Sequence, residues 1–265
     1  MDFGMIHYNA PGATLEEFLD YVSDAGFKYV ELAAADVWPK DESDPEQRAE
    51  RVQRGLEKRV LRASALAVGN DFAVLEDDAV HAQVARMKRF CGLALLVGTN
   101  VLRTEGGAPK ESVPEDRWVE AIAGCLVRCR EFIEPMGVRL AVDNHGFITN
   151  DADLQLEVLR RVNSRNVGVN LDTMNYRWFG KDLKTLDRYY AMVAPHVFHT
   201  HLKDGRGARA EYVGTALGEG EINLAHAVAC LKKAGYKGVW CAEYEGREDK
   251  AEGYHKCLAW MRQNI

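Results

Sequence analysis

Acidic and imidazole side chains follow four apolar segments in the second half of this chain, at the point where each segment ends. Carboxylates and imidazoles are the groups that most often move protons in enzymes, and they also bind divalent cations. In an extended strand, alternate residues of each stretch share one face. The four stretches are AVDNHG at 141–146, NLDTMN at 170–175, HTHLKD at 199–204 and CAEYEG at 241–246.

One residue from each stretch is a candidate metal ligand. Buried like charges repel strongly, so three carboxylates and an imidazole are hard to place together unless a divalent cation neutralises them. Taken singly, each could be an ordinary residue at a strand end, but four in succession favour a shared site. Such a ligand set suits Mn²⁺, Mg²⁺, Co²⁺ or Zn²⁺ and does not distinguish them. We expect one divalent cation and take Mn²⁺ as the first candidate to test. The candidates are Asp143, Asp172, His201 and Glu243.

Several neighbouring polar residues are candidates for catalysis or substrate binding. His145 lies two residues after Asp143 and so on the same face, where it could act as a general base or bond a loop carbonyl. Arg103 and Lys203 could bind a substrate oxyanion or form plain salt bridges. Glu31, in a Val-Glu-Leu segment, could accept a hydrogen bond from a substrate hydroxyl or from a neighbouring loop.

Aromatic residues follow three of the predicted strands, the second, the fifth and the sixth. Trp38 lies after the second, and Trp178 follows the sixth together with other rings. Sugars present apolar C–H faces that stack on aromatic rings, so both tryptophans are candidate substrate contacts. Aromatic loops also simply cover a barrel end or meet a partner subunit.

Short apolar segments alternate with longer amphipathic ones from end to end, which predicts eight strand–helix pairs. Eight such units in this length favour a closed (β/α)8 TIM barrel, a single domain over residues 1–265, with its chemistry at the carboxyl ends of the strands. An open doubly wound sheet would show a Gly-rich turn after the first strand, which is absent at 8–12. The predicted strands are 3–8, 29–33, 62–68, 101–104, 139–143, 167–171, 197–202 and 239–242. The predicted helices are 14–25, 44–59, 77–96, 114–136, 152–162, 183–194, 223–234 and 250–262.

Composition narrows the class of partner. The 265 residues include 34 basic and 40 acidic side chains, a net charge of −6, which argues against binding of nucleic acid. No run of about 18 apolar residues occurs, so we expect no membrane span. We also expect no signal peptide, because the first residues have neither a basic stretch nor a long apolar one. Six cysteines without a C-x-x-C motif fit a reducing, cytoplasmic setting.

These motifs resemble the xylose isomerase-like superfamily of sugar isomerases and epimerases, which includes D-tagatose 3-epimerase, inosose dehydratase, hydroxypyruvate isomerase and, more distantly, endonuclease IV. The resemblance runs the whole length of the chain and implies a metal held by the four candidate ligands. It also implies that Asp143 and Glu243 move protons on opposite faces of the substrate, and that the protein forms a homo-oligomer. The segments that carry it are GFKYVEL at 26–32, DNH at 143–145, LDT at 171–173, HLKD at 201–204, LGEGEI at 217–222 and AEYEG at 242–246.

Two residues depart from the family. Its usual glutamate on the fifth strand is replaced by Asp143, which is one methylene shorter and reaches a substrate less well, and this raises His145 as the possible base. Ketohexose epimerases carry histidine where this chain has Asn175, whose amide can hold a hydroxyl or carbonyl but cannot take the same proton.

Our leading hypothesis is a metal-dependent isomerase or epimerase of a small keto-sugar or polyol. The alternative uses the same proton abstraction but ends in β-elimination, as a dehydratase or lyase of inosose, dehydroshikimate or 3-keto-glycoside type. An abasic-site endonuclease would need more histidines and a basic face. A non-catalytic sugar-binding relative is disfavoured because all four ligand-type residues are present.

Overall fold

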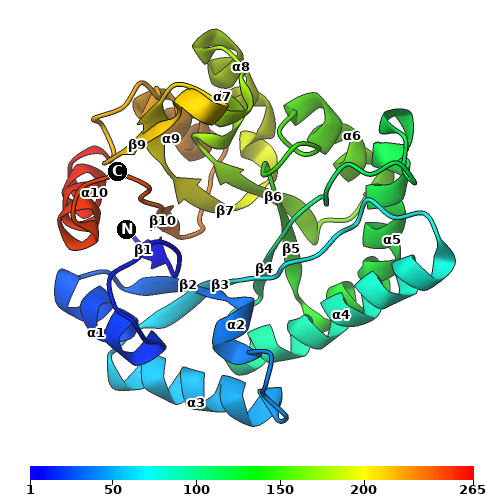
Figure 1. The fold of residues 1–265 in the computed structure, drawn as a ribbon, viewed down its shortest axis with the longest axis horizontal. Coiled ribbons are helices and arrows are strands. Elements are labelled where there is room, and N and C mark those ends of the chain that lie inside the picture. The colour runs from blue at the N-terminus through cyan, green and yellow to red at the C-terminus, as the bar shows by residue number, and fades with distance from the viewer.

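The chain folds as a closed barrel of eight parallel strands, described by a computed structural model of residues 1–265 (Figure 1). The strands neighbour one another in the order β1-β10-β7-β6-β5-β4-β3-β2, so the ring closes between β1 and β2. This confirms the predicted (β/α)8 barrel. The strands are β1 (Phe3–Ile6), β2 (Tyr29–Ala33), β3 (Arg62–Ala67), β4 (Val101–Thr104), β5 (Arg139–Asp143), β6 (Val167–Asp172), β7 (Val197–Leu202) and β10 (Trp240–Ala242).

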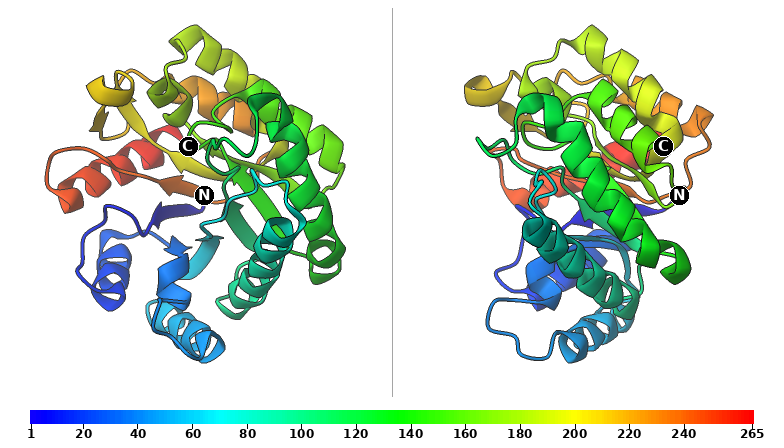
Figure 2. Two further views of the ribbon diagram at one scale, coloured as in Figure 1. Left: turned by 45° about the vertical axis from the view of Figure 1, so that its right-hand side comes forward. Right: turned by 90° about the vertical axis from the view of Figure 1, so that its right-hand side faces the viewer.

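Eight longer helices surround the barrel and cover the outer face of its strands (Figure 2). Their bounds agree with the predicted ones to within a few residues, the widest gap being at α5, where a 3-10 turn (Glu115–Arg117) comes first. None of them combines the length and the apolar character that a membrane span requires. The helices are α1 (Leu15–Ala25), α3 (Pro45–Lys58), α4 (Asp77–Leu96), α5 (Trp118–Met136), α6 (Ala152–Val162), α8 (Leu183–Val193), α9 (Leu224–Lys233) and α10 (Lys250–Asn264).

Helix α1 shows how local sequence sets these bounds. The hydroxyl of Thr14 accepts a hydrogen bond from the backbone N–H of Glu17 at 3.2 Å, which satisfies an otherwise unpaired donor at the helix start. The Glu17 carboxylate accepts in return from the N–H of Ala13 at 2.7 Å, one residue earlier than in a standard capping box. Gly26 ends the helix at a φ of +92°, a conformation that favours glycine.

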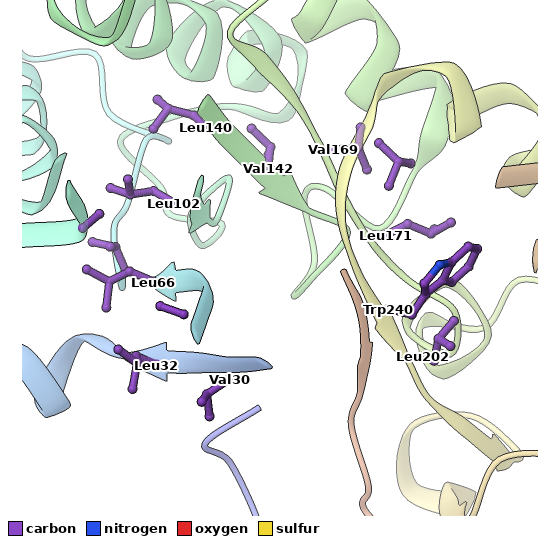
Figure 3. Close-up of a cluster of buried hydrophobic side chains, with 14 of the residues drawn as sticks. Val30, Leu32, Leu66, Leu102, Leu140, Val142, Val169, Leu171, Leu202 and Trp240 are labelled. Carbon is purple, nitrogen blue, oxygen red and sulfur yellow. The ribbon is translucent and has the colours of Figure 1, made fainter. Parts of the chain in front are cut away.

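Alternation along the strands separates the core from the site. Apolar side chains point outward and pack against the helices, as the labelled residues in Figure 3 show. On β7, Leu202 belongs to this outer core, whereas His199 and His201 face the barrel interior. Polar residues therefore reach the interior while the outer layer stays apolar.

Several short elements after the strands were not predicted from the sequence. They include two short helices, α2 (Ala34–Val37) and α7 (Asn175–Phe179), and a hairpin of β8 (Asp204–Arg206) and β9 (Val213–Thr215). A single helical turn is too short to show an amphipathic period, and the three-residue strands of the hairpin are not apolar segments like those of the barrel. These short elements lie at the carboxyl ends of the strands, and α7 contributes Asn175 to the lining of the cavity at this end.

Candidate metal centre and active site

A cavity of about 310 Å³ opens at the carboxyl end of the barrel. This is the end at which TIM barrels place their active sites. Most of the polar residues singled out in the sequence line this cavity, and they come from strands all round the ring. Those are Glu31, Arg103, His145, Asn175, His201, Lys203 and Glu243.

Three of the four predicted metal ligands gather beside the cavity. The ligand atoms of Asp172, His201 and Glu243 all lie within 4.8 Å of one another. Their side chains are buried, and they come from the ends of the neighbouring strands β6, β7 and β10. The group thus brings two carboxylates and an imidazole to one point, a candidate site for a divalent cation.

Carboxylates flank both ring nitrogens of His201. Nε2 lies 2.7 Å from Glu31 Oε2, and Nδ1 lies 3.0 Å from Glu243 Oε2. Burial opposes protonation of the ring, but Glu31 and Glu243 outweigh it and raise the pKa of His201 to about 10. Glu31, predicted as a substrate contact, therefore also fixes the orientation of the imidazole, as carboxylates commonly do for metal-binding histidines.

The fourth predicted ligand, Asp143, does not join this group. Its Oδ2 pairs with the Arg103 guanidinium at 2.7 Å from Nε and 2.5 Å from Nη2. Burial disfavours the carboxylate, yet Arg103 outweighs it and lowers the pKa of Asp143. Arg103 was expected to bind a substrate oxyanion or to form a salt bridge, and here it forms the salt bridge.

Lys203 neutralises the rest of the acidic group. Its Nζ lies 2.9 Å from both Asp172 Oδ2 and Glu243 Oε1. Burial raises the pKa of Asp172 to about 7 despite Lys203, whereas Lys203 and His201 overcome burial and lower the pKa of Glu243. The expectation of unpaired carboxylates is wrong, because Lys203 and Arg103 already offset their charge.

The donor set nevertheless fits a divalent cation. Asp143 Oδ1, Asp172 Oδ2 and His201 Nδ1 are buried and have no hydrogen-bond partner; the contacts of the last two with charged groups are ion pairs without hydrogen-bond geometry. Buried polar atoms are rarely left in this state. Two carboxylate oxygens and an imidazole nitrogen are suitable ligands for Mn²⁺, Mg²⁺, Co²⁺ or Zn²⁺.

The two predicted tryptophans do not line the cavity. Trp38 packs on Phe90 with ring centroids 5.5 Å apart, because α2 turns the chain toward α4 directly after β2. Trp178 meets the edge of Phe147 at 6.1 Å, at the rim formed by α7. Asn175, the first residue of α7, is buried and does line the cavity.

Sequence analysis missed a histidine at this site. His7 lies one residue beyond β1 and lines the cavity, while its ring contacts the carboxylate of Asp36 on α2. Its position directly after an apolar segment was an available signal. Its partner could not have been found, because α2 is too short to be predicted.

Comparisons with known proteins agree with this fold. A family model described as a xylose isomerase-like TIM barrel matches residues 19–264. An uncharacterized protein of Methanocaldococcus jannaschii is 24% identical over 123 residues, which are 45% of this chain and 41% of that protein. The chain thus spans less than half the length of this curated relative.

Several solved structures share the fold over nearly their whole length. The IolI protein with a bound zinc atom has a TM-score of 0.80 at 18% identity, covering 100% of this chain and 98% of that one. D-psicose 3-epimerase of Clostridium cellulolyticum also has 0.80 at 14% identity, with coverages of 100% and 99%. 3-Keto-D-glucoside 4-epimerase of E. coli has 0.80 at 14%, with 99% of each chain. At these identities the likeness establishes the fold.

Proposed function

Because the chain belongs to the xylose isomerase-like TIM-barrel family, we propose that it is a divalent-metal-dependent isomerase or epimerase of a keto-sugar or polyol. The observation that carries the proposal is the buried group of Asp172, His201 and Glu243 beside a cavity of about 310 Å³. Epimerases of small ketoses among the structural neighbours support the same class of reaction.

The ligands we propose are Asp172, His201 and Glu243, with Asp143 as a fourth through its unpartnered Oδ1. When bound, the cation polarises the substrate carbonyl and so makes the neighbouring C–H bond more acidic. We take Mn²⁺ as the first candidate. Zinc is an alternative supported by the IolI neighbour, and Mg²⁺ and Co²⁺ suit the same donors.

Proton transfer falls to the titratable groups of the cavity. His145 is half exposed, lines the cavity, and lies 3.7 Å from the Glu105 carboxylate. Because Arg103 holds Asp143, we propose His145 as the base that takes the proton next to the carbonyl. Asp143 and Glu243 are the two carboxylates that the family resemblance assigns to proton transfer.

Substrate binding is assigned to the polar groups on the cavity wall. Lys203 and Arg103 supply positive charge for a substrate oxygen, and Asn175 and Glu31 can donate to or accept from hydroxyls. Trp38 and Trp178, away from the cavity lining, would contact only a substrate that extends beyond it.

A dehydratase or lyase is the alternative. It shares the first step, and the imidazole of His145 beside Glu105 can also protonate a leaving hydroxyl group. The two outcomes differ in product, because isomerisation conserves the substrate's atoms whereas elimination yields an unsaturated ketone and water or an alcohol.

The metal is tested first, by elemental analysis of the purified protein after reconstitution with Mn²⁺. We expect about one ion per chain in the wild type and in Glu111→Gln, an exposed control, and loss of the ion in Asp172→Asn and His201→Ala. Circular dichroism checks that each variant folds. A folded wild type that binds no divalent ion would contradict the proposal.

The reaction is tested next, by incubating the Mn²⁺-loaded protein with ketoses in D₂O and following them by NMR. An epimerase places deuterium in the recovered ketose and in its epimer. A lyase instead produces absorbance from a conjugated enone. Turnover that is unaffected by a chelator would show that the reaction does not require the metal.

We further propose a homo-oligomer in a reducing, cytoplasmic setting that does not bind nucleic acid. The six cysteines are all unpaired, and the net charge of −6 disfavours a phosphate backbone. Light scattering coupled to size-exclusion chromatography measures the mass of the assembly directly.

A further inference from the structure

His7, the cavity histidine to which the proposed function assigns no role, forms a close pair with a buried carboxylate. His7 Nδ1 lies 2.9 Å from both carboxylate oxygens of Asp36, so this nitrogen carries a proton that it donates to the carboxylate. No protein group bonds Nε2, and the residue lines the same cavity as the candidate metal group. A carboxylate that fixes one imidazole nitrogen and leaves the other free for the substrate is a recurring catalytic arrangement.

Packing restrains this pair further. The His7 ring stacks on Phe18 with centroids 4.0 Å apart and planes at 13°, which limits its rotation. Asp36 is buried, and its Oδ2 also accepts the backbone N–H of Ala33 at 2.7 Å. Both restraints orient the ring while leaving it partly exposed to the cavity.

Barrel geometry places His7 opposite His145. His7 follows β1 and His145 follows β5, and these strands are four positions apart in the closed ring of eight. Both residues line the one cavity. A substrate between them presents one face to each imidazole.

The carboxylate on the His7 side is already engaged. Glu243 follows β10, the neighbour of β1, and its Oε1 accepts a hydrogen bond from Lys203 at 2.9 Å while its Oε2 lies 3.0 Å from His201. On the other side, Arg103 holds Asp143. The two carboxylates that the family resemblance assigns to proton transfer are thus both in ion pairs, whereas the two histidines are not bonded to a cation.

We propose that His7, oriented by Asp36, is the second acid–base group of the site and acts on the substrate face opposite His145. One imidazole takes the proton from the carbon next to the carbonyl, and the C–H electron pair forms an enediolate. The other imidazole, already protonated, returns a proton to the same carbon from the opposite side. The atoms and electrons balance without an oxidant or reductant. This inference rests on the proposed isomerase or epimerase function.

The test follows deuterium exchange into each member of an epimeric ketose pair, D-psicose and D-fructose, in D₂O with Mn²⁺-loaded protein. In a two-base reaction each base takes the proton of one epimer only. We therefore expect His7→Gln and His145→Gln each to lose epimer formation by about 100-fold or more, while each still exchanges one member of the pair, and a different one. A structural defect would lower exchange of both members together.

Further variants separate positioning from chemistry. Asp36→Asn is expected to slow exchange of the same member that His7→Gln affects, by about 10-fold or more, at unchanged metal content. His255→Gln, an exposed histidine on α10, is the matched control and should leave both exchanges unaltered. If His7→Gln exchanges both members of the pair at equal rates, His7 is not the second acid–base group, while the proposed function still stands. Absence of exchange by the wild type with either ketose would instead overturn the proposed function, and this inference with it.

Discussion

At the residue scale, ion pairing determines which ionisable groups of the cavity are free for chemistry. Arg103 forms an ion pair with Asp143, and Lys203 forms ion pairs with both Asp172 and Glu243. The negative charge of these carboxylates is therefore offset by the two cations. A cation that enters must displace or share these contacts. The ion pairs of each carboxylate, rather than the number of carboxylates, therefore limit which of them can bind a metal or transfer a proton.

The surroundings of His199 likewise set its protonation state. Its Nδ1 lies 2.8 Å from Asn170 Oδ1 and 3.3 Å from Glu31 Oε2, and its Nε2 lies 3.1 Å from Ser64 Oγ; burial outweighs the Glu31 carboxylate and favours the uncharged ring. Burial lowers the pKa of His199 to about 4, from an ordinary value near 6.5. The folded protein thus keeps this imidazole neutral at pH values where the unfolded chain protonates it.

This pKa shift predicts a pH dependence of stability. The stabilisation is complete above pH 6.5 and is lost as the pH falls toward 4, because only the unfolded state gains a proton there, at a cost of at most about 3 kcal/mol. Urea unfolding of metal-free protein between pH 7 and pH 4.5 measures it. His199→Gln should flatten the curve and His255→Gln should not. Parallel curves for wild type and His199→Gln would refute the assignment.

At the element scale, one buried carboxylate organises the segment after β7. Asp204 Oδ1 accepts the N–H groups of Gly205 and Ile222, and Oδ2 accepts those of Gly218 and Gly220. These four bonds join the β8–β9 hairpin to the segment that leads into α9. The hairpin begins directly after Lys203, the residue that follows β7.

Removing this carboxylate should release the segment. Asp204→Ala leaves four backbone donors without their acceptor, and we expect a loss of about 3 kcal/mol in the free energy of unfolding. Limited proteolysis should show new cleavage between residues 205 and 222. The exposed Glu211→Ala in the same segment provides the comparison. Unchanged protease resistance of Asp204→Ala would show that the hairpin is held by other contacts.

At the scale of the whole molecule, the candidate metal site exists only when the barrel is closed. Its three ligands come from β6, β7 and the end of β10, and they are far apart in the sequence. A cation that binds the folded chain and not the unfolded chain stabilises the fold by mass action.

Metal should therefore raise the stability of the whole barrel. At about 100 times its dissociation constant, Mn²⁺ is expected to add about 3 kcal/mol to the free energy of unfolding relative to protein in chelator. Urea titrations with and without metal measure this gain, which Asp172→Asn should abolish. The same gain in that variant would place the ion elsewhere on the molecule.

The sequence by itself determined the barrel and the kinds of residue at its mouth. Strand and helix periodicity is local, and the alternation of AVDNH or HTHLK along a strand decides which side chains face inward. The eight strand–helix pairs and the inward position of His201 and Glu31 follow from such patterns.

Only the tertiary structure decided which polar groups are partners. Glu31 meets His201 across 170 residues, Arg103 meets Asp143 across 40, and His7 meets Asp36 across 29. These contacts depend on closure of the ring, on strand register and on side-chain rotamers, none of which is encoded in local periodicity. For this reason the fold and the kinds of residue at the barrel mouth could be predicted from the sequence, whereas the pairing of Asp143 and the place of His7 could not.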